Sequence, residues 1–342
     1  MRAAVMRNKT MVVADLPEPV PGPGQVLVET IACGICGSDL HALLHAEKLN
    51  ESAKASGVPF VFDIDRDVVM GHEFSARVAA LGAGVTNVKP GDMVVSMPVM
   101  LSAEGFAAIG YSNQYPGGYA ERMLLTAGLC LAVPEGLDPR HAALTEPMAV
   151  GLHAVAKSGI KPGDAALVLG CGPVGLAVIA ALKLAGIEPI VAADFSAMRR
   201  SLATRLGAHE VVDPREEAAI AAWQRVDGTR PLVIFEAVGV PGMLDRAMRD
   251  APRAARILVV GVCMETDQIW PIVGINKELS IQFALGYTPE EFSRTLAHIA
   301  AGDIDVAPLI TGEVGIAGVP EAFRTLASPD AHAKILVEPA LG

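Results

Sequence analysis

The chain is poor in basic residues, in charged residues overall and in cysteine, and each shortage excludes a class of protein. Lys and Arg number 27 against 38 Asp and Glu, so the net charge is −11 and we expect neither nucleic acid nor an anionic membrane as a partner. Only 19% of residues are charged while 51% are hydrophobic, which excludes a disordered chain. Five cysteines in 342 residues are too few for a disulfide scaffold and indicate a reducing, cytoplasmic environment.

No long hydrophobic run is free of helix-breaking residues. Residues 165–182 form 18 uncharged positions, which meets the length of a membrane-spanning helix, but three glycines and a proline interrupt the centre. A buried strand, a glycine turn and a buried helix produce the same run, so we expect a soluble protein. The apolar run at 1–6 is too short for a signal-peptide core.

Secondary-structure signals change in character along the chain. Residues 1–150 contain short apolar runs between Pro- and Gly-rich turns, a spacing typical of an all-β barrel or sandwich. The strands predicted there are 3–6, 11–15, 25–31, 74–81, 93–97 and 120–125. From residue 165 strands alternate with helices, which predicts an α/β fold with a parallel, doubly wound sheet. Its predicted elements are strands 165–169, 188–193, 210–212, 232–237, 257–260 and 280–285, and helices 173–185, 196–206 and 214–225.

Two segments have the composition of a helix N-terminus. Residues 213–216 (DPRE) combine a capping aspartate with a proline and a glutamate in the first turn, and they predict the start of helix 214–225. Residues 288–291 (TPEE) form a capping box that opens another helix. A helix at 321–327 and a strand at 334–337 follow, and we expect this last part to rejoin the first domain.

A dinucleotide-binding motif lies between an apolar strand and an apolar helix. Residues 170–175 (GCGPVG) fit G-x-G-x-x-G, in which the glycines allow a tight turn, the approach of a pyrophosphate and close helix packing. Asp194 follows the next strand, where a carboxylate binds ribose hydroxyls and repels a 2′-phosphate; this favours NAD over NADP, although Arg199 and Arg200 can soften the preference. The predicted cofactor-binding residues are Gly170, Gly172, Pro173, Val174, Gly175, Asp194 and Arg199.

Residue types that bind metals gather at three places, 33–41 (CGICGSDLH), 71–73 (GHE) and Glu146. A catalytic zinc takes three ligands from Cys, His and carboxylate groups and keeps one position open. No second C-x-x-C follows, so a structural zinc ribbon is not supported. A redox pair of Cys33 and Cys36 would need a βαβ context that is missing here.

These motifs, together with 117–121 (GGYAE) and 146–147 (EP), resemble the zinc-dependent alcohol dehydrogenases of the medium-chain dehydrogenase/reductase superfamily. The sorbitol, threonine and butanediol dehydrogenase branch is the most similar, and the resemblance covers essentially the whole chain. It implies a GroES-like β-barrel catalytic domain at 1–150, a Rossmann NAD-binding domain at 151–286 and a return to the catalytic domain at 287–342. The implied reaction transfers a hydride between a secondary alcohol or polyol and NAD, giving a ketone or aldehyde.

The resemblance also implies a zinc shell. Cys36 and His72 match two zinc ligands, and the third is either Glu73 or Glu146, with Glu73 acting as a ligand or exchanging with water. Asp39 matches the acid that orients the ligand histidine, since a hydrogen bond to one ring nitrogen determines the tautomer.

Ser38 and His41 match a proton relay, in which the serine takes the hydroxyl proton of the substrate and the histidine passes it to solvent. Two departures from the family pattern are visible. Residues 93–129 contain no cysteine, so the structural zinc of many relatives is absent and one catalytic zinc per chain is expected. The segment 42–69 is longer than usual, and we expect its part at 47–67 to form a lid or rim near the substrate.

Two other functions are less consistent with these residues. A zinc-free quinone or enoyl reductase of the same fold would lack the Cys and His ligands, and a catalytically silent NAD-binding protein would carry a broken ligand set or relay. The expected partners are a small alcohol or ketone substrate and further copies of the chain, in a homodimer or homotetramer like those of the family.

Overall fold

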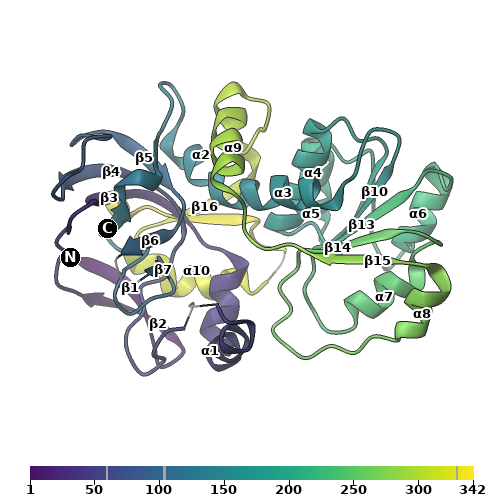
Figure 1. The fold of residues 1–342 in the computed structure, drawn as a ribbon, viewed down its shortest axis with the longest axis horizontal. Coiled ribbons are helices and arrows are strands. Elements are labelled where there is room, and N and C mark those ends of the chain that lie inside the picture. Colours follow the sequence, from purple (N-terminus) through teal and green to yellow (C-terminus); the bar gives the residue numbers. More distant parts are fainter. Residues whose placement is uncertain (59–60, 103–104, 329) are drawn as a thin grey trace. The chain divides into compact units, whose positions relative to one another are not determined.

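The computed structural model describes residues 1–58, 61–102, 105–328 and 330–342 (Figure 1). The described chain divides into two compact units. Unit 1 comprises Met1–Glu146, Phe292–Ala300 and Ile310–Gly342, and unit 2 comprises Pro147–Glu291 and Ala301–Leu309.

Unit 1 is built mainly from strands. They are β1 (Arg2–Arg7), β2 (Thr10–Asp15), β3 (Gln25–Gly34), β4 (Glu73–Leu81), β5 (Met93–Ser96), β6 (Val99–Ser102), β7 (Gly105–Ala108), β8 (Arg122–Thr126), β9 (Cys130–Ala132), β16 (Ile310–Val314) and β17 (Lys334–Val337). Its helices are α1 (Gly37–Ser56), α2 (Pro139–Ala143), most of α9 (Pro289–Ala301), α10 (Val319–Leu326) and the short turns η1 (Ala127–Leu129), η3 (Ile316–Gly318) and η4 (Pro339–Leu341).

The register of the main sheet in unit 1 brings distant segments together. The strand order is β16-β17-β3-β4-β5-β9, with β8 also paired to β3, and β3 runs antiparallel to both β4 and β17. The end of β3 therefore lies beside the first residues of β4 and the last two residues of β17, and Gly34 pairs with Glu73 on one side and Leu336 on the other. The apolar faces of these strands form the core, whose largest fully buried side chains include Tyr119, Phe74 and Met123.

Unit 2 alternates strands and helices. Its elements are β10 (Ala165–Leu169), α4 (Pro173–Leu184), β11 (Ile190–Ala193), α5 (Ala197–Leu206), β12 (Glu210–Val212), α6 (Ala219–Val226), β13 (Leu232–Glu236), α7 (Met243–Asp250), β14 (Arg256–Val259), α8 (Pro271–Lys277), β15 (Ser280–Phe283), η2 (Ala307–Leu309) and, from Pro147 on, α3 (Thr145–Ser158).

The sheet of unit 2 is parallel, with the order β12-β11-β10-β13-β14-β15. The inner strands β11 and β13 are buried along their whole length, which explains why they read as continuous apolar runs. From β10 the chain adds β11 and β12 on one side of the sheet and then β13, β14 and β15 on the other, so the order of strands reverses between β10 and β13. In sheets of this kind ligands bind at the carboxyl ends of the strands beside such a reversal. The parallel sheet predicted for the part of the chain from residue 165 on is confirmed.

One local expectation is wrong, and two elements were not predicted. The helix predicted at 214–225 begins only at Ala219, because the Asp213 carboxylate accepts hydrogen bonds from the backbone and guanidinium of Arg215 and from Arg200, which forms a separate turn. The stretch 47–67 contains the end of a twenty-residue helix, α1, that the sequence pattern did not reveal; residues 59–60 of this stretch lie outside the described part. The hairpin β6–β7 was also not anticipated.

The capping box at 288–291 is present, since the Thr288 amide donates to the Glu291 carboxylate and the Glu291 amide donates to the Thr288 hydroxyl. The uncharged run at 165–182 is divided between β10 and α4. Among the described residues, none of the helices has both the length and the apolar character required to cross a membrane.

Candidate active site

Helix α1 begins directly after β3, an inner strand of the main sheet. Cys36 is the N-cap residue of α1, and its backbone amide donates to the Asp39 carboxylate at 3.0 Å. A carboxylate in the first turn satisfies a free amide and interacts favourably with the positive end of the helix dipole. The helix start therefore fixes where the Cys36 thiol and the Asp39 carboxylate lie.

His72 and Glu73 approach the same place from the next strand, because Glu73 is the first residue of β4 and pairs with Gly34. The ligand atoms of Cys36, His72 and Glu73 all lie within 4.8 Å of one another. His72 Nδ1 faces Asp39 Oδ1 at 3.4 Å, which leaves Nε2 as the ring nitrogen available to a metal. This set of thiol, imidazole and carboxylate fits the donors that zinc takes.

A buried lysine completes this cluster from the opposite side of β3. Lys334 opens β17, and its Nζ lies 2.8 and 2.6 Å from the two Glu73 oxygens and 3.1 Å from the Ile35 carbonyl oxygen. Burial lowers the pKa of Lys334, but the charges of Glu73 and Cys36 and the hydrogen bonds that Lys334 donates to Glu73 outweigh it and raise the pKa above its usual value.

Asp39 is fully buried, accepts three hydrogen bonds and faces the His72 ring. Oδ2 accepts from the Cys36 amide and from the Tyr119 hydroxyl at 2.6 Å, while Oδ1 accepts from the Tyr111 hydroxyl at 2.9 Å and faces His72. Burial raises the pKa of Asp39, but the charge and hydrogen bond of His72 lower it more, so the pKa lies below its ordinary value.

The pKa of His72 is shifted by burial and by its neighbours Asp39 and Cys36. Burial lowers the pKa of His72, yet Asp39 and Cys36 raise it to well above its ordinary value. The pKa values of His72 and Lys334 are both raised because acidic groups surround them, and it is these acidic groups, with the neutral form of His72, that a metal cation would bind.

The other residues predicted for this site, Glu146, Ser38 and His41, are not part of the close ligand group. Glu146, in the first turn of α3, is not part of the close Cys36, His72 and Glu73 group, although its charge contributes to raising the pKa of Lys334. The Ser38 hydroxyl lies 2.9 Å from the Tyr111 hydroxyl, and no hydrogen bond joins it to His41 in the described part of the chain. Burial and the nearby His45 lower the pKa of His41, whose Nδ1 has no partner among the described residues.

The glycine motif lies at the carboxyl end of β10, where the crevice of the parallel sheet opens. Gly172 is the N-cap of α4, and a β-carbon there would have only Arg199 Nη1 within 4 Å among the described residues, at 3.8 Å. A β-carbon at Gly175 would come 2.0 Å from the Gly170 carbonyl oxygen. The loop is therefore open on the side from which a pyrophosphate approaches and tight where helix and strand meet, which fits a dinucleotide.

Asp194 and Arg199 flank this loop. The Asp194 carboxylate accepts from the Cys171 amide at 2.7 Å and from the Ser196 amide at 2.8 Å, so it joins the turns after β10 and β11. Arg199 extends to Gly172, and its buried Nε has no hydrogen-bond partner among the described residues. An unpaired guanidinium nitrogen beside the phosphate-binding turn is consistent with a missing anionic ligand.

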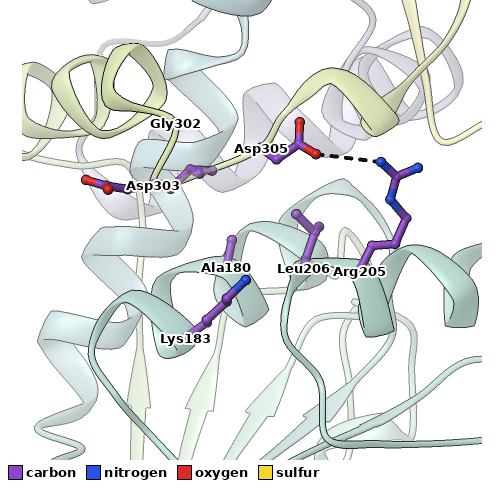
Figure 2. Close-up of a pocket in the computed structure, with 8 residues that line it drawn as sticks. Ala180, Lys183, Arg205, Leu206, Gly302, Asp303 and Asp305 are labelled. Atoms are coloured by element: carbon purple, nitrogen blue, oxygen red, sulfur yellow. Dashed lines mark ion pairs between the residues drawn. The ribbon is translucent and has the colours of Figure 1, made fainter.

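A small hollow of about 70 Å³ elsewhere in unit 2 does not belong to this site (Figure 2). It is lined by Ala180, Lys183, Arg205, Leu206, Gly302, Asp303, Ile304 and Asp305. The ion pair between Arg205 and Asp305, 3.6 Å long, spans part of it. Lys183 and Arg205 are in the last turns of α4 and α5, whereas ligands of such sheets bind near the first turns.

Three residues that surround the Cys36, His72 and Glu73 group were not predicted from the sequence. Tyr119 is part of the GGYAE motif that carried the resemblance, but its bond to Asp39 was not anticipated. Lys334 is the single charge in the predicted strand 334–337, and a charge within an apolar run was the available signal. Tyr111 lies in a turn with no motif, so nothing in the sequence indicated it.

A cation-favouring Cys, His and carboxylate cluster in one unit and a glycine phosphate loop in the other define a metal-dependent dehydrogenase. The family models described as "Alcohol dehydrogenase GroES-like domain" and "Zinc-binding dehydrogenase" match residues 22–135 and 173–301. (R,R)-Butanediol dehydrogenase of Bacillus subtilis strain 168 is 33% identical over 365 residues, covering 99% of this chain and 100% of the relative. Sorbitol dehydrogenase of the same strain is 27% identical over 99% of this chain and 97% of the relative.

The solved structure of 2R,3R-butanediol dehydrogenase from Bacillus subtilis superposes with a TM-score of 0.84 at 34% identity, covering 99% of each chain. The chain belongs to the zinc-dependent alcohol dehydrogenases of the medium-chain dehydrogenase/reductase superfamily. It is an oxidoreductase that acts on CH–OH groups, and its cofactors are zinc and NAD. These comparisons support the zinc enzyme and not the zinc-free reductase or the silent NAD-binding protein.

Proposed function

We propose that the chain oxidises a secondary alcohol that carries a second hydroxyl on the neighbouring carbon, with NAD as hydride acceptor, and also catalyses the reverse reduction. The observation that carries the proposal is the cluster of Cys36, His72 and Glu73, whose ligand atoms lie within 4.8 Å of one another. The names of the relatives supply the substrate class, since butanediol and sorbitol both carry adjacent hydroxyl groups.

In this proposal Cys36 and His72 hold the zinc permanently, and Glu146 is the third ligand. Glu73 is the exchanging carboxylate, because Lys334 already engages both of its oxygens. Bound zinc supplies the positive charge that makes loss of the substrate's hydroxyl proton feasible near neutral pH. Asp39 holds the His72 ring in the tautomer that leaves Nε2 free.

Two further side chains move the proton. Ser38 accepts it from the substrate hydroxyl, and His41 passes it to solvent. The lowered pKa of His41 supports this role, since the ring is then neutral and able to accept a proton at physiological pH.

Gly170, Gly172, Pro173, Val174 and Gly175 hold the pyrophosphate, Asp194 binds the ribose hydroxyls, and Arg199 neutralises the phosphates. The two backbone amides that bind Asp194 support its role, because they hold the carboxylate beside the phosphate loop. A fixed carboxylate there repels the additional phosphate of NADP, and this selects NAD.

A substrate panel and one variant test the reaction. We expect wild-type protein with stoichiometric zinc to form NADH from 2,3-butanediol or a polyol faster than from 2-butanol. Cys36→Ala removes a thiolate ligand, so it should abolish turnover and zinc binding while leaving NADH affinity, measured by fluorescence titration, nearly unchanged. Turnover by zinc-free Cys36→Ala would contradict the metal assignment, and equal rates with 2-butanol would contradict the diol preference.

The third zinc ligand is tested by a matched pair of variants. We expect Glu146→Gln to weaken zinc binding at least tenfold, whereas Glu73→Gln keeps its zinc and loses part of its turnover rate. The measurement is zinc content after dialysis against a competing chelator. Retained zinc in Glu146→Gln together with lost zinc in Glu73→Gln would reverse the assignment of the two carboxylates.

We also propose that the protein is a cytoplasmic homodimer or homotetramer. All five thiols are free, which supports a reducing compartment. The edge strand β15 exposes Phe283, followed by Leu285, with 64% and 78% of their surface accessible, and Ile275 in α8 is 68% accessible. Exposed apolar side chains beside an unpaired strand edge support an interface with a second copy.

A further inference from the structure

Tyr111 is the direct neighbour of the serine that the proposed relay uses. Its hydroxyl lies 2.9 Å from Ser38 Oγ and 2.9 Å from Asp39 Oδ1. Its ring is 5.3 Å from the His72 ring, measured between centroids. One phenol therefore links the serine to the carboxylate that orients the histidine.

The turn that carries Tyr111 is built against the His72 loop. It follows the β6–β7 hairpin, which belongs to the cysteine-free stretch 93–129. The amides of Gly117 and Gly118 donate to the carbonyls of Val69 and Gly71. Gly110 has a φ of +87°, and a β-carbon there would come 3.0 Å from the Gly71 oxygen. This close backbone contact holds Tyr111 beside the residue that follows Gly71, which is His72.

The directions of the hydrogen bonds follow from the donors available. A carboxylate only accepts, so the single phenol proton of Tyr111 goes to Asp39. The Tyr111 oxygen then accepts from the Ser38 hydroxyl. A serine that donates to a phenol keeps its lone pairs for another donor, and in alcohol oxidation that donor is the substrate hydroxyl. As Ser38 takes the substrate proton, its own hydroxyl proton leaves Tyr111 and passes to His41, so the serine stays neutral.

We propose that Tyr111 is a positioning residue that holds the Ser38 hydroxyl with its lone pairs available to the substrate. The role rests on the proposed function of Ser38 as proton acceptor. Without the Tyr111 hydroxyl, Ser38 can turn toward other acceptors, and the fraction of productive orientations falls. Both phenols donate to Asp39, so loss of either lowers zinc affinity, whereas only loss of the Tyr111 hydroxyl also acts on Ser38 and on the catalytic step.

A double-mutant cycle tests the proposal with Tyr111→Phe, Ser38→Ala and the combination. We expect Tyr111→Phe, assayed at saturating zinc, to lower kcat about tenfold, part of the 10²–10⁴ that a general acid–base group contributes, with KM unchanged. In the Ser38→Ala background the same change should have no further effect on kcat. Equal losses in both backgrounds would show that Tyr111 acts without Ser38 and would overturn the proposal.

Tyr119→Phe is the matched control, since it removes the other phenol bonded to Asp39 without touching Ser38. We expect it to reduce zinc affinity and to leave the solvent deuterium isotope effect on kcat unchanged, whereas Tyr111→Phe changes that isotope effect. The same change of isotope effect in both variants would assign the result to Asp39 alone and contradict a role through Ser38.

A measurement without turnover separates this inference from the proposed function. The chain has four tyrosines, so the Raman doublet that reports hydrogen bonding of phenols is simple to follow. Ser38→Ala should shift it in the wild-type background and leave it unchanged when Tyr111 is Phe. Absence of the shift would overturn the contact, whereas its presence in a protein that oxidises no alcohol would refute only the proposed function.

Discussion

At the scale of single residues, the ion pair between Lys334 and Glu73 is the most consequential feature of unit 1. Both side chains are almost completely buried, with 3% and 0% of their surface exposed. Burying two charges is costly, and such a pair gains little over an apolar one of the same size. Its value here is electrostatic, because Lys334 neutralises a carboxylate that would otherwise stand next to a thiolate.

Replacing one member of this pair should be much worse than replacing both. We expect Lys334→Met to lower the free energy of unfolding by about 3–5 kcal/mol, because it leaves the Glu73 carboxylate buried and unpaired. The double variant Lys334→Met with Glu73→Gln should recover most of that loss. Urea unfolding of the chelator-treated proteins measures both, and a single variant as stable as wild type would refute the argument.

At the scale of elements, the strand β10, the glycine turn and the helix α4 together form the proposed cofactor-binding segment. Gly172 and Gly175 differ in what a methyl group would meet. Gly172 has ordinary helix-start geometry, with φ of −66° and open space in front of it, whereas Gly175 touches the Gly170 carbonyl. One glycine therefore leaves room for a ligand, and the other for the protein's own backbone.

Two alanine variants separate these roles. Gly172→Ala should leave stability within about 0.5 kcal/mol of wild type and weaken NADH binding at least tenfold, since the methyl occupies the pyrophosphate side. Gly175→Ala should cost about 1–3 kcal/mol of stability through overpacking. Thermal unfolding and NADH fluorescence titration read the two effects. Unchanged NADH affinity in Gly172→Ala would contradict the assigned approach of the cofactor.

At the scale of the whole molecule, the parallel sheet of unit 2 ends in an open strand. Within the described part of the chain β15 pairs with β14 alone, and three of its four residues are exposed while the fourth is half-buried. Natural proteins rarely leave an apolar edge of this kind bare, because it pairs with other chains. The proposed homo-oligomer accounts for it.

A charge on this edge should dissociate the assembly. We expect Phe283→Glu to shift the sedimentation coefficient to that of a monomer, because the carboxylate would be desolvated in the interface. Val20→Glu is the control, since Val20 is 83% exposed and belongs to unit 1, whereas β15 belongs to unit 2. A Phe283→Glu protein with the mass of wild type would place the interface elsewhere.

The sequence alone determined the features whose signal is local. The parallel sheet follows from apolar strands alternating with helices, the proposed phosphate loop from three glycines within six residues, and the thiol and imidazole proposed to bind zinc from short motifs typical of the family. The helix predicted at 214–225 also had a local pattern. Its start was wrong because Arg200, in the preceding helix, donates a hydrogen bond to the Asp213 carboxylate that was expected to cap it.

Only the tertiary structure decided what surrounds these motifs. Lys334 reaches Glu73 across 261 positions of chain because β3 runs antiparallel to both neighbouring strands, and Tyr111 reaches Ser38 because its turn packs on the His72 loop. Short motifs encode backbone geometry that depends on adjacent residues. The charges around a buried site instead come from several strands, and which strands lie next to each other is determined only when the sheet forms.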